Sequence, residues 1–320
     1  MQPITSQRIY FLVVVTSIAV SAFTLASLFG RRSYLELATH FRLQYALAAS
    51  ACVILLIAFH SWRLLPLALC CAILNWTFIL PYYAGARPTA APGAIHLRLM
   101  HANLRGGNKD YAALTAVVEE ERPDILVLQE FTEQWQEHLR HTLGSQYPYS
   151  KLAPRPGGSG MALFSRYPLE GAEVLTLDAS SHLAILARFN VYGTPLSVWA
   201  LHPPTPMRPD KFANRNEQFA RAASIMREAR GPKLIIGDLN TTMWSPYFTE
   251  LLDESGLRDA RRGFGLRPSW PVPLPTPFQI PIDHCLVGGG VAVEEVRTGG
   301  RTGSDHRPLI VEVSFERGAP

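Results

Sequence analysis

Five apolar runs in the C-terminal part of the chain each end in polar side chains that could carry chemistry, and a sixth run is preceded by such side chains. The residues at these ends are Asn103, Glu130, His202, Asp238 with Asn240, Asp283 with His284, and Asp305 with His306. Carboxylates, amides and imidazoles bind divalent cations and transfer protons, and such groups collect where a rigid scaffold positions them. We therefore expect eight of these residues, all except His284, to meet in one cleft, although they lie up to 203 residues apart in the chain.

Each of these residues also has an ordinary structural explanation when it is considered alone. Glu130 could cap a helix or lie on the surface, and His202 precedes two prolines, as a turn residue would. Asp238 and Asn240 could form an Asx turn. Six such ends in one chain favour the catalytic interpretation over six separate coincidences. The other histidines of this part are interpreted as ordinary surface or core residues: His96, His101, His138, His141 and His182.

An alternation of strands and helices would position these ends. Apolar runs predict strands at 95–103, 125–129, 160–164, 184–192, 196–201, 233–236, 280–287, 291–297 and 308–314. Helices are predicted at 110–122, at 132–143, from Asp210 onward and at 245–254, and six prolines within 265–281 predict a loop over the surface. Many short strands with helices between them favour an α/β fold in which two sheets pack face to face with helices outside.

The N-terminal quarter of the chain has a different composition. Residues 9–29, 43–62 and 64–86 are three uncharged, mostly apolar runs, each about as long as a helix that spans the hydrocarbon core of a bilayer. A signal peptide for the first run and a buried core helix are the alternatives, and three such runs close together disfavour both. Residues 1–86 are therefore predicted as a membrane anchor with three transmembrane helices, 87–94 as a linker and 95–317 as the catalytic domain.

The charge of the chain is unevenly distributed. The full sequence has 30 basic and 26 acidic residues, but residues 1–89 contain six arginines and one glutamate, which leaves 24 basic and 25 acidic residues for the remainder. A nearly neutral catalytic part counts against a broad electrostatic grip on nucleic acid. The four cysteines have no zinc-site spacing, and only one of them lies in the C-terminal part.

Five short motifs carry a family resemblance. They are Leu128–Glu130 (LQE), His202–Pro203, Gly237–Asn240 (GDLN), Ile282–His284 (IDH) and Ser304–Pro308 (SDHRP). In this order the series resembles the endonuclease/exonuclease/phosphatase superfamily, the deoxyribonuclease I-like group, over residues 95–317. Leu239 stands where phenylalanine is commoner. With three spans in front, the chain most resembles the membrane-anchored bacterial branch that includes teicoplanin-resistance-type phosphatases. The resemblance implies a four-layer α/β sandwich.

The resemblance also implies a metal-dependent hydrolysis of phosphoesters. Glu130 would be the main ligand of Mg²⁺, which prefers one or two carboxylates and keeps several waters. Asn103 would support the ion through its amide oxygen or a water, and Asp305 is a second candidate ligand. Manganese is an equally acceptable ion for these ligands.

Five further residues acquire catalytic roles from the resemblance. Asp238 would orient and deprotonate the attacking water, and Asn240 would hold that carboxylate or the phosphate. His306 would donate to a phosphate oxygen, and Asp283 would orient its ring. His202 would be a second donor to the phosphate.

The substrate is expected to be a lipid phosphate, pyrophosphate or phosphodiester, because an anchor confines the site to the bilayer surface. A few arginines would meet its anionic head group, with Arg105 and Arg208 as candidates beside Arg155 and Arg215. A nuclease is the alternative from the same chemistry, disfavoured by the missing basic surface. A catalytically inactive binding module is a third possibility, disfavoured because the polar positions of the family are intact.

The orientation in the membrane does not follow from charge alone. Arg8, Arg63 and the amino terminus would lie on one side, and Arg31, Arg32 and Arg42 would lie with the domain on the other, which is nearly a tie. The tight loop at Arg63 favours the cytoplasmic side for that loop, and the resemblance implies a domain outside. We therefore expect a multi-pass protein of the cell membrane with an extracytoplasmic catalytic domain.

Overall fold

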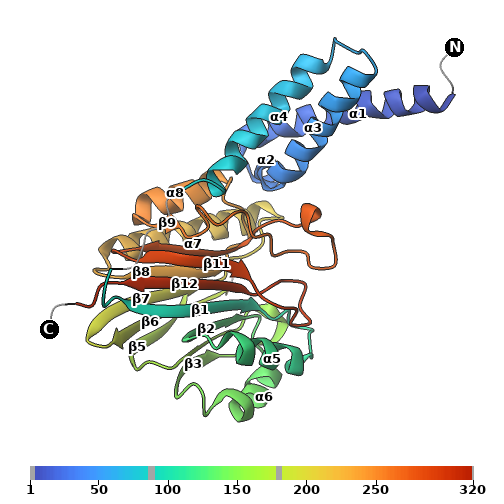
Figure 1. Ribbon diagram of the computed structural model, residues 1–320. Coiled ribbons are helices and arrows are strands. Elements are labelled where there is room, and N and C mark those ends of the chain that lie inside the picture. The colour runs from blue at the N-terminus through green and yellow to red at the C-terminus, as the bar shows by residue number, and fades with distance from the viewer. Residues whose placement is uncertain (1–3, 86–90, 178–181, 319–320) are drawn as a thin grey trace.

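Two six-stranded sheets packed face to face make up the C-terminal part of the chain (Figure 1). This computed structural model describes residues 4–85, 91–177 and 182–318. In spatial order, the first sheet contains β11 (Ala292–Thr298), β12 (Leu309–Phe315), β1 (Ile95–Asn103), β2 (Ile125–Gln129), β4 (Met161–Ser165) and β3 (Tyr149–Ala153). The second contains β5 (Leu169–Thr176), β6 (Leu183–Val191), β7 (Thr194–Leu201), β8 (Lys233–Asp238), β10 (Asp283–Gly288) and β9 (Arg258–Asp259).

Apolar residues that alternate along the strands create the layers. In β1, Leu97 and Leu99 pack between the two sheets, whereas Met100 and Ala102 pack beneath the outer helices. This is the two-residue period of a strand with both faces buried. One pair of helices covers the first sheet and another pair covers the second, so the predicted four-layer sandwich is confirmed. The outer helices are α5 (Tyr111–Glu121), α6 (Glu133–Leu143), α7 (Pro209–Glu228) and α8 (Pro246–Ser255).

The strand pairing brings the predicted polar ends to one edge of the sandwich. The strands β1 and β2 are parallel neighbours, with Asn103 opposite Gln129. In the second sheet β7 is parallel to β8, and β10 is antiparallel to β8 with Asp283 opposite Asp238. Gln129 links the two sheets at this edge, because its Nε2 donates to the Leu201 carbonyl and its Oε1 accepts from the Asp238 N–H, both at 2.9 Å.

The same link explains the glycine that precedes Asp238. A Cβ atom at Gly237 would overlap the carbonyl oxygen of Leu201 and the side-chain amide of Gln129. Any larger residue would therefore push the sheets apart at the catalytic edge and disrupt the Gln129 bridge.

Three N-terminal helices are long and apolar enough to cross a bilayer, over Ser6–Phe29, Ser33–Ala58 and Leu65–Tyr82 (Figure 1). They overlap the three predicted runs, but the second run was predicted to reach residue 62 and its α-helix ends at Ala58. Residues 86–90, with the end of the third run and part of the predicted linker, lie outside the described residues. The elements are α1 (Ile4–Ala26), η1 (Ser27–Phe29), α2 (Ser33–Glu36), η2 (Leu37–Phe41), α3 (Arg42–Ala58), α4 (Leu65–Ile79) and η3 (Leu80–Tyr82).

Polar groups inside this helical bundle are paired with one another. Asn75 donates from Nδ2 to Thr24 Oγ1 at 3.0 Å, and its Oδ1 accepts from Arg42 Nη1 at 3.1 Å. The Arg42 guanidinium also lies 4.1 Å from the centre of the Phe78 ring. The arginine that was counted with the connecting loop is therefore buried among the helices.

Residues 33–41, which lie between α1 and α3 and which we call the anchor turn, dock on the C-terminal sandwich. Glu36 and Arg215 form a fully buried ion pair across this contact, with 2.8 Å between Oε1 and Nη2. The Ser245 hydroxyl also donates to Glu36. Nearby, the Tyr247 hydroxyl donates to the Arg31 carbonyl at 2.9 Å. The helical bundle and the sandwich are thus packed together rather than merely tethered.

The structure differs from the sequence expectations at several elements. Strands β3, β5 and β9 were not predicted, because their exposed or short sequences have no clear apolar pattern. The proline-rich segment 265–281 is irregular, as expected, but it is not confined to the surface. Leu266, Ser269, Val272 and Ile280 are buried, because apolar residues between the prolines pack into the fold.

Candidate active site

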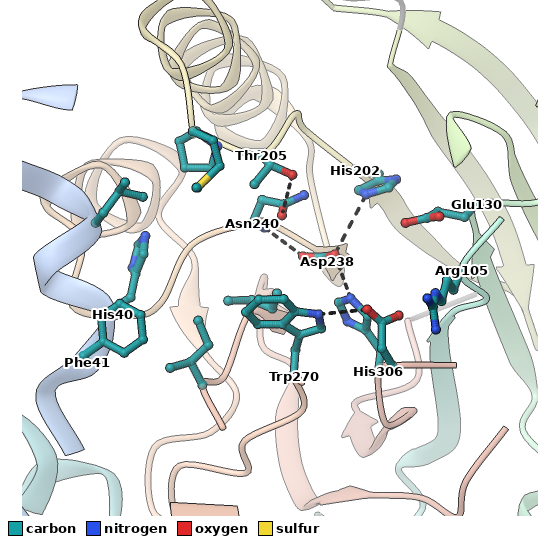
Figure 2. A pocket seen from close by; sticks show the side chains of 16 residues that line it. His40, Phe41, Arg105, Glu130, His202, Thr205, Asp238, Asn240, Trp270 and His306 are labelled. Carbon is teal, nitrogen blue, oxygen red and sulfur yellow. Dashed lines mark hydrogen bonds and ion pairs between the residues drawn. The ribbon is translucent and has the colours of Figure 1, made fainter. Parts of the chain in front are cut away.

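A cavity of about 440 Å³ opens at the edge where the strand ends converge, and most of the predicted residues line it (Figure 2). The lining includes Glu130, His202, Asp238, Asn240, Asp305 and His306. Asn103 and Asp283 stand behind these residues and hydrogen-bond to them. The structure therefore brings together the eight strand-end residues that the sequence singled out.

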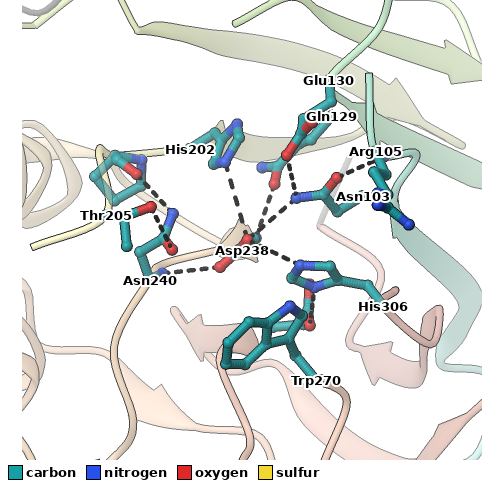
Figure 3. Close-up of polar contacts among 12 residues, drawn as sticks. Asn103, Arg105, Gln129, Glu130, His202, Thr205, Asp238, Asn240, Trp270 and His306 are labelled. Atoms are coloured by element: carbon teal, nitrogen blue, oxygen red, sulfur yellow. Dashed lines mark hydrogen bonds and ion pairs between the residues drawn. The ribbon is translucent and has the colours of Figure 1, made fainter. Parts of the chain in front are cut away.

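Asp238, the last residue of β8, is the centre of the polar network (Figure 3). Its Oδ1 accepts the backbone N–H of Asn240 at 2.9 Å, and its Oδ2 accepts Asn103 Nδ2 at 3.2 Å. The Nε2 atoms of His306 and His202 lie 3.7 and 3.9 Å from Oδ2. Burial raises the pKa of Asp238 to about 7, against the opposing charge of His306. A carboxylate with such a pKa is suited to take a proton from water near neutral pH.

His306 and Asp283 form a buried pair beside Asp238. His306 Nδ1 lies 3.0 Å from Asp283 Oδ2, so the carboxylate fixes the ring and leaves Nε2 toward the cavity. Burial alone would lower the pKa of His306, but the charges of Asp283 and Asp238 outweigh it and raise that pKa to about 9. Burial opposes the ionisation of Asp283, yet His306 and His101 hold its pKa well below the usual value. His306 is therefore arranged as a charged hydrogen-bond donor.

His101 belongs to this network, although it was interpreted as an ordinary histidine. It is fully buried in β1, and its Nε2 lies 2.9 Å from Asp283 Oδ1. Both oxygens of Asp283 are thus bound by imidazoles. Strand alternation was the sequence signal for this role, because it places His101 on the same face of β1 as Asn103. A buried imidazole on that face needs a hydrogen-bond partner.

His202 is a neutral imidazole at the edge of the network. Burial lowers its pKa to about 3, with smaller effects from the neighbouring His182, His101 and His306. The ring of His182 contacts it edge-on, with 5.9 Å between the ring centres. A neutral His202 keeps one N–H and one lone pair, so it can donate a single hydrogen bond to a substrate oxygen.

Glu130 and Asn103 form the part of the site where oxygen ligands are available for a cation. Glu130 Oε1 accepts Asn103 Nδ2 at 3.1 Å, and Oε2 accepts the Gly106 N–H at 2.8 Å. A Cβ atom at Gly158 would come within 2.9 Å of Oε2, so this glycine keeps the space beside the carboxylate open. Asn103 directs its amide nitrogen, and not the predicted oxygen, at the carboxylates, because its Oδ1 accepts the Arg105 N–H at 2.9 Å.

These residues fit a divalent cation. The Glu130 and Asp238 carboxylates share one amide donor, and a hard cation prefers such oxygen ligands. Asp305, whose Oδ2 accepts Trp270 Nε1 at 3.1 Å, lines the same cavity. Asp238, Asp283 and His306 also present ligand atoms within 4.8 Å of one another. We regard that trio as a proton-handling group, because Asp283 is fully buried between two imidazoles and does not line the cavity, whereas Glu130 does.

Asn240 and the buried His284 help to hold the loop after β8. Asn240 Nδ2 donates to the Pro203 carbonyl at 3.0 Å, and its Oδ1 accepts the Thr205 hydroxyl at 3.2 Å. His284 Nε2 lies 2.8 Å from the Thr241 carbonyl. Asn240 therefore orients Asp238 through its backbone N–H, while His284 supports the loop from inside the fold.

Of the candidate arginines, the structure places Arg105 in the cavity and Arg208 outside it. Arg105 forms no ion pair with any carboxylate in the described part of the chain, which leaves its charge available for an anion. Arg208 is exposed and makes two hydrogen bonds to Asp210, at 3.0 and 2.9 Å. Arg215 is occupied by Glu36.

Several cavity residues had no signal in the sequence. Trp270 comes from the proline-rich segment, and Leu37, His40 and Phe41 come from the anchor turn (Figure 2). These four are remote from the polar motifs in the chain, so only the packing of the anchor turn and the loop reveals them.

Comparisons with known proteins agree with this geometry. A sequence profile of the Endonuclease/Exonuclease/phosphatase family matches residues 100–306. No curated protein matches the sequence. Among solved structures, D. rerio TDP2 complexed with single strand DNA product is 15% identical with a TM-score of 0.59, covering 68% of this chain and 98% of that one.

Two bacterial structures are similarly close. The endonuclease/exonuclease/phosphatase from Beutenbergia cavernae is 19% identical, with a TM-score of 0.56 and coverage of 69% of this chain and 72% of that one. Sphingomyelinase C from Streptomyces griseocarneus is 18% identical, with a TM-score of 0.52 and coverage of 70% and 100%. At these identities the structures show the fold alone, while the profile covers most of the sandwich. The chain therefore belongs to the Endonuclease/Exonuclease/phosphatase family.

Proposed function

We propose that this chain is a membrane-anchored phosphohydrolase that uses a divalent cation, Mg²⁺ or Mn²⁺, to cleave a phosphoester of a lipid or another small phosphorylated substrate. Members of the family are phosphoester hydrolases. The observation that carries the finer proposal is the docking of three apolar helices on the catalytic domain through the buried Glu36–Arg215 pair. This contact would hold the cavity at a bilayer surface, where lipid head groups are the concentrated phosphoesters.

In the proposed reaction, Asp238 takes a proton from the attacking water and the backbone N–H of Asn240 keeps its carboxylate in place. His306 donates from Nε2 to a phosphate oxygen, and Asp283 holds the ring in that orientation. His202 donates a second hydrogen bond from the opposite side of Asp238, and Arg105 supplies a positive charge to the head group.

A divalent cation would be held by Glu130, with Asn103 and Asp305 as supporting residues. When bound there, it would neutralise charge on the phosphate oxygens and so lower the barrier to attack. Asn103 would hold the Glu130 and Asp238 carboxylates next to each other, because its amide nitrogen donates a hydrogen bond to each of them.

A nuclease is the competing proposal, and charge argues against it. Residues 90–320 contain 24 basic and 25 acidic residues, whereas binding to a nucleic-acid backbone normally requires several unpaired cations on one face. An inactive binding module is disfavoured because the acid–base residues are present and mutually hydrogen-bonded.

The full chain, reconstituted in nanodiscs with Mg²⁺, should be assayed against a polyprenyl pyrophosphate, sphingomyelin and plasmid DNA. We expect release of phosphate or head group from a lipid, lost on chelation and lost in Asp238→Asn, with the plasmid intact. Nicking of the plasmid without lipid turnover would overturn the lipid proposal and favour the nuclease. Binding of one of these three substrates without turnover of any of them would favour the inactive module.

A further inference from the structure

The cavity around Asp238 has a polar end and an apolar end. Figure 2 shows Arg105 and Glu130 on one side of Asp238 and His40 and Phe41 on the opposite side. The polar end carries the groups that would meet a phosphate. The other end is therefore the place for whatever part of the substrate is attached to that phosphate.

The aliphatic and aromatic side chains that line the cavity come from two separate parts of the chain. Leu37 and Phe41 come from the anchor turn, and Met207, Ile280 and Ile282 come from the catalytic domain. Phe41 and Met207 remain 39% and 60% exposed. Large apolar side chains that stay exposed beside a catalytic cavity are typical of a site for an apolar ligand.

Simple packing of the anchor turn does not account for this exposure. Glu36, Ala38, Thr39 and His40 are the buried residues of the segment, and Glu36 and His40 contact the C-terminal domain. His40 Nδ1 lies 3.1 Å from Thr242 Oγ1, and the Thr39 hydroxyl donates to the Glu36 carbonyl at 2.7 Å. Phe41 directly follows these anchored residues and is held at the cavity without being buried by it.

The apolar end also lies where a lipid chain would need to leave the cavity. The anchor turn connects α1 to α3, and both helices belong to segments long and apolar enough to cross a bilayer. An alkyl chain that runs from the cavity past Phe41 would therefore reach the hydrocarbon region along the protein surface, with little apolar area passing through water.

We infer that the anchor turn is part of the substrate site, with Leu37 and Phe41 binding the apolar chain next to the phosphate. The inference rests on the proposed function and extends it, because the anchor then recognises the substrate as well as holding the enzyme at the membrane. The fixed position of the turn means that little ordering is needed when an alkyl chain binds.

The test is a binding measurement with two phosphonates that differ only in chain length. The full chain in phosphatidylcholine nanodiscs with Mg²⁺ is titrated calorimetrically with methylphosphonate and with octylphosphonate, and the heat of partitioning into empty nanodiscs is subtracted. Each buried methylene strengthens binding about 4-fold, so burial of three of the seven additional methylenes gives roughly 60-fold tighter binding of octylphosphonate.

Phe41→Ala should reduce this preference about 10-fold and leave the Kd for methylphosphonate unchanged, which also shows that the variant is folded. Tyr34→Ala is the matched control: Tyr34 lies in the same turn, is 62% exposed and does not line the cavity, so the preference should be unchanged. Leu37→Ala provides a second variant of the same surface.

Each outcome decides a separate question. Equal affinity of the wild type for both phosphonates, or an unchanged preference in both Phe41→Ala and Leu37→Ala, would overturn the role of the anchor turn and leave the proposed phosphohydrolase intact. Failure of the wild type to bind methylphosphonate would contradict the proposed phosphate site itself.

Discussion

Replacement of Arg215 by methionine is the sharpest test of the contact between the anchor turn and the catalytic domain. Arg215 and Glu36 are both fully buried, and the substitution would leave the Glu36 carboxylate in the interior without its counter-ion. Methionine keeps an unbranched apolar stem near the Phe212, Phe219 and Tyr247 rings that surround the guanidinium. The main change is therefore the loss of charge.

The expected loss in the free energy of unfolding depends on the contacts that Glu36 keeps in the variant. Breaking a buried ion pair by removing one partner costs about 3–5 kcal/mol. The Ser245 hydroxyl still donates to Glu36, which favours the lower end, so we expect a loss of about 3 kcal/mol in the free energy of unfolding. For a domain of about 200 residues this lowers Tm by roughly 6–12 °C.

The double variant Glu36→Gln/Arg215→Met removes both charges and should recover most of the loss, because no unpaired charge stays buried. The assay is thermal unfolding of the full chain and both variants under one set of conditions. If the anchor turn separates from the domain instead, trypsin should cleave faster after Arg31 or Arg32. A single variant with wild-type Tm and wild-type cleavage, or a double variant as unstable as the single one, would refute the reasoning.

Four further outcomes are expected. Asp238→Asn should keep the wild-type circular dichroism and lower kcat about 10²–10⁴-fold, because an amide cannot take a proton from water; near-wild-type turnover would remove Asp238 as the base. Glu130→Gln should raise the Mg²⁺ concentration for half-maximal activity, and an unchanged titration would exclude it as the main ligand. The folded-state pKa of Asp283 lies below its unfolded value, so its stabilisation is present above pH of about 4 and is lost as the pH falls. His101→Asn should lower the free energy of unfolding by about 1–3 kcal/mol at neutral pH. On acidification the variant should lose less of its free energy of unfolding than the wild type does. Thermal unfolding of both proteins across pH measures this, and parallel profiles would contradict it. A C-terminal alkaline phosphatase fusion should be active and a green fluorescent protein fusion dark if the domain is extracytoplasmic, and the reverse pattern would place it in the cytoplasm.

Most of the polar ends could be predicted from the sequence because they follow apolar runs that have few alternatives to buried strands, whereas Asp305 and His306 come just before such a run. Asp238 and Asn240 come directly after such a run, and the pairing of β8 with β10 then places Asp283 opposite Asp238. The roles of two neighbours were not predicted. His101 lies inside its strand rather than at the end, and the amide of Asn103 is turned by the Arg105 N–H, a contact that only the backbone of the following loop determines.

The anchor-derived wall of the cavity was beyond sequence reasoning for a different reason. Phe41 lies 197 positions before Asp238, in a segment whose hydropathy a membrane-spanning helix would explain, so nothing in its pattern indicates a second role. Arg105 and Arg208 were likewise equal candidates by residue type. The fold separates them, because Arg105 lines the cavity and pairs with no described carboxylate, whereas Arg208 lies outside it and is bound to Asp210.

The single acidic residue of the N-terminal quarter connects these observations. Glu36 is the only glutamate or aspartate among residues 1–89, and it forms the ion pair with Arg215 across the docking contact. A buried charge pair contributes little net stability relative to apolar packing, but either charge is costly without the other. Such a pair therefore favours one docked arrangement over the alternative ways in which apolar helices could lie on the domain. The segment that follows Glu36 contains the cavity residues Leu37 and Phe41, so the same ion pair that specifies docking also fixes the wall of the site.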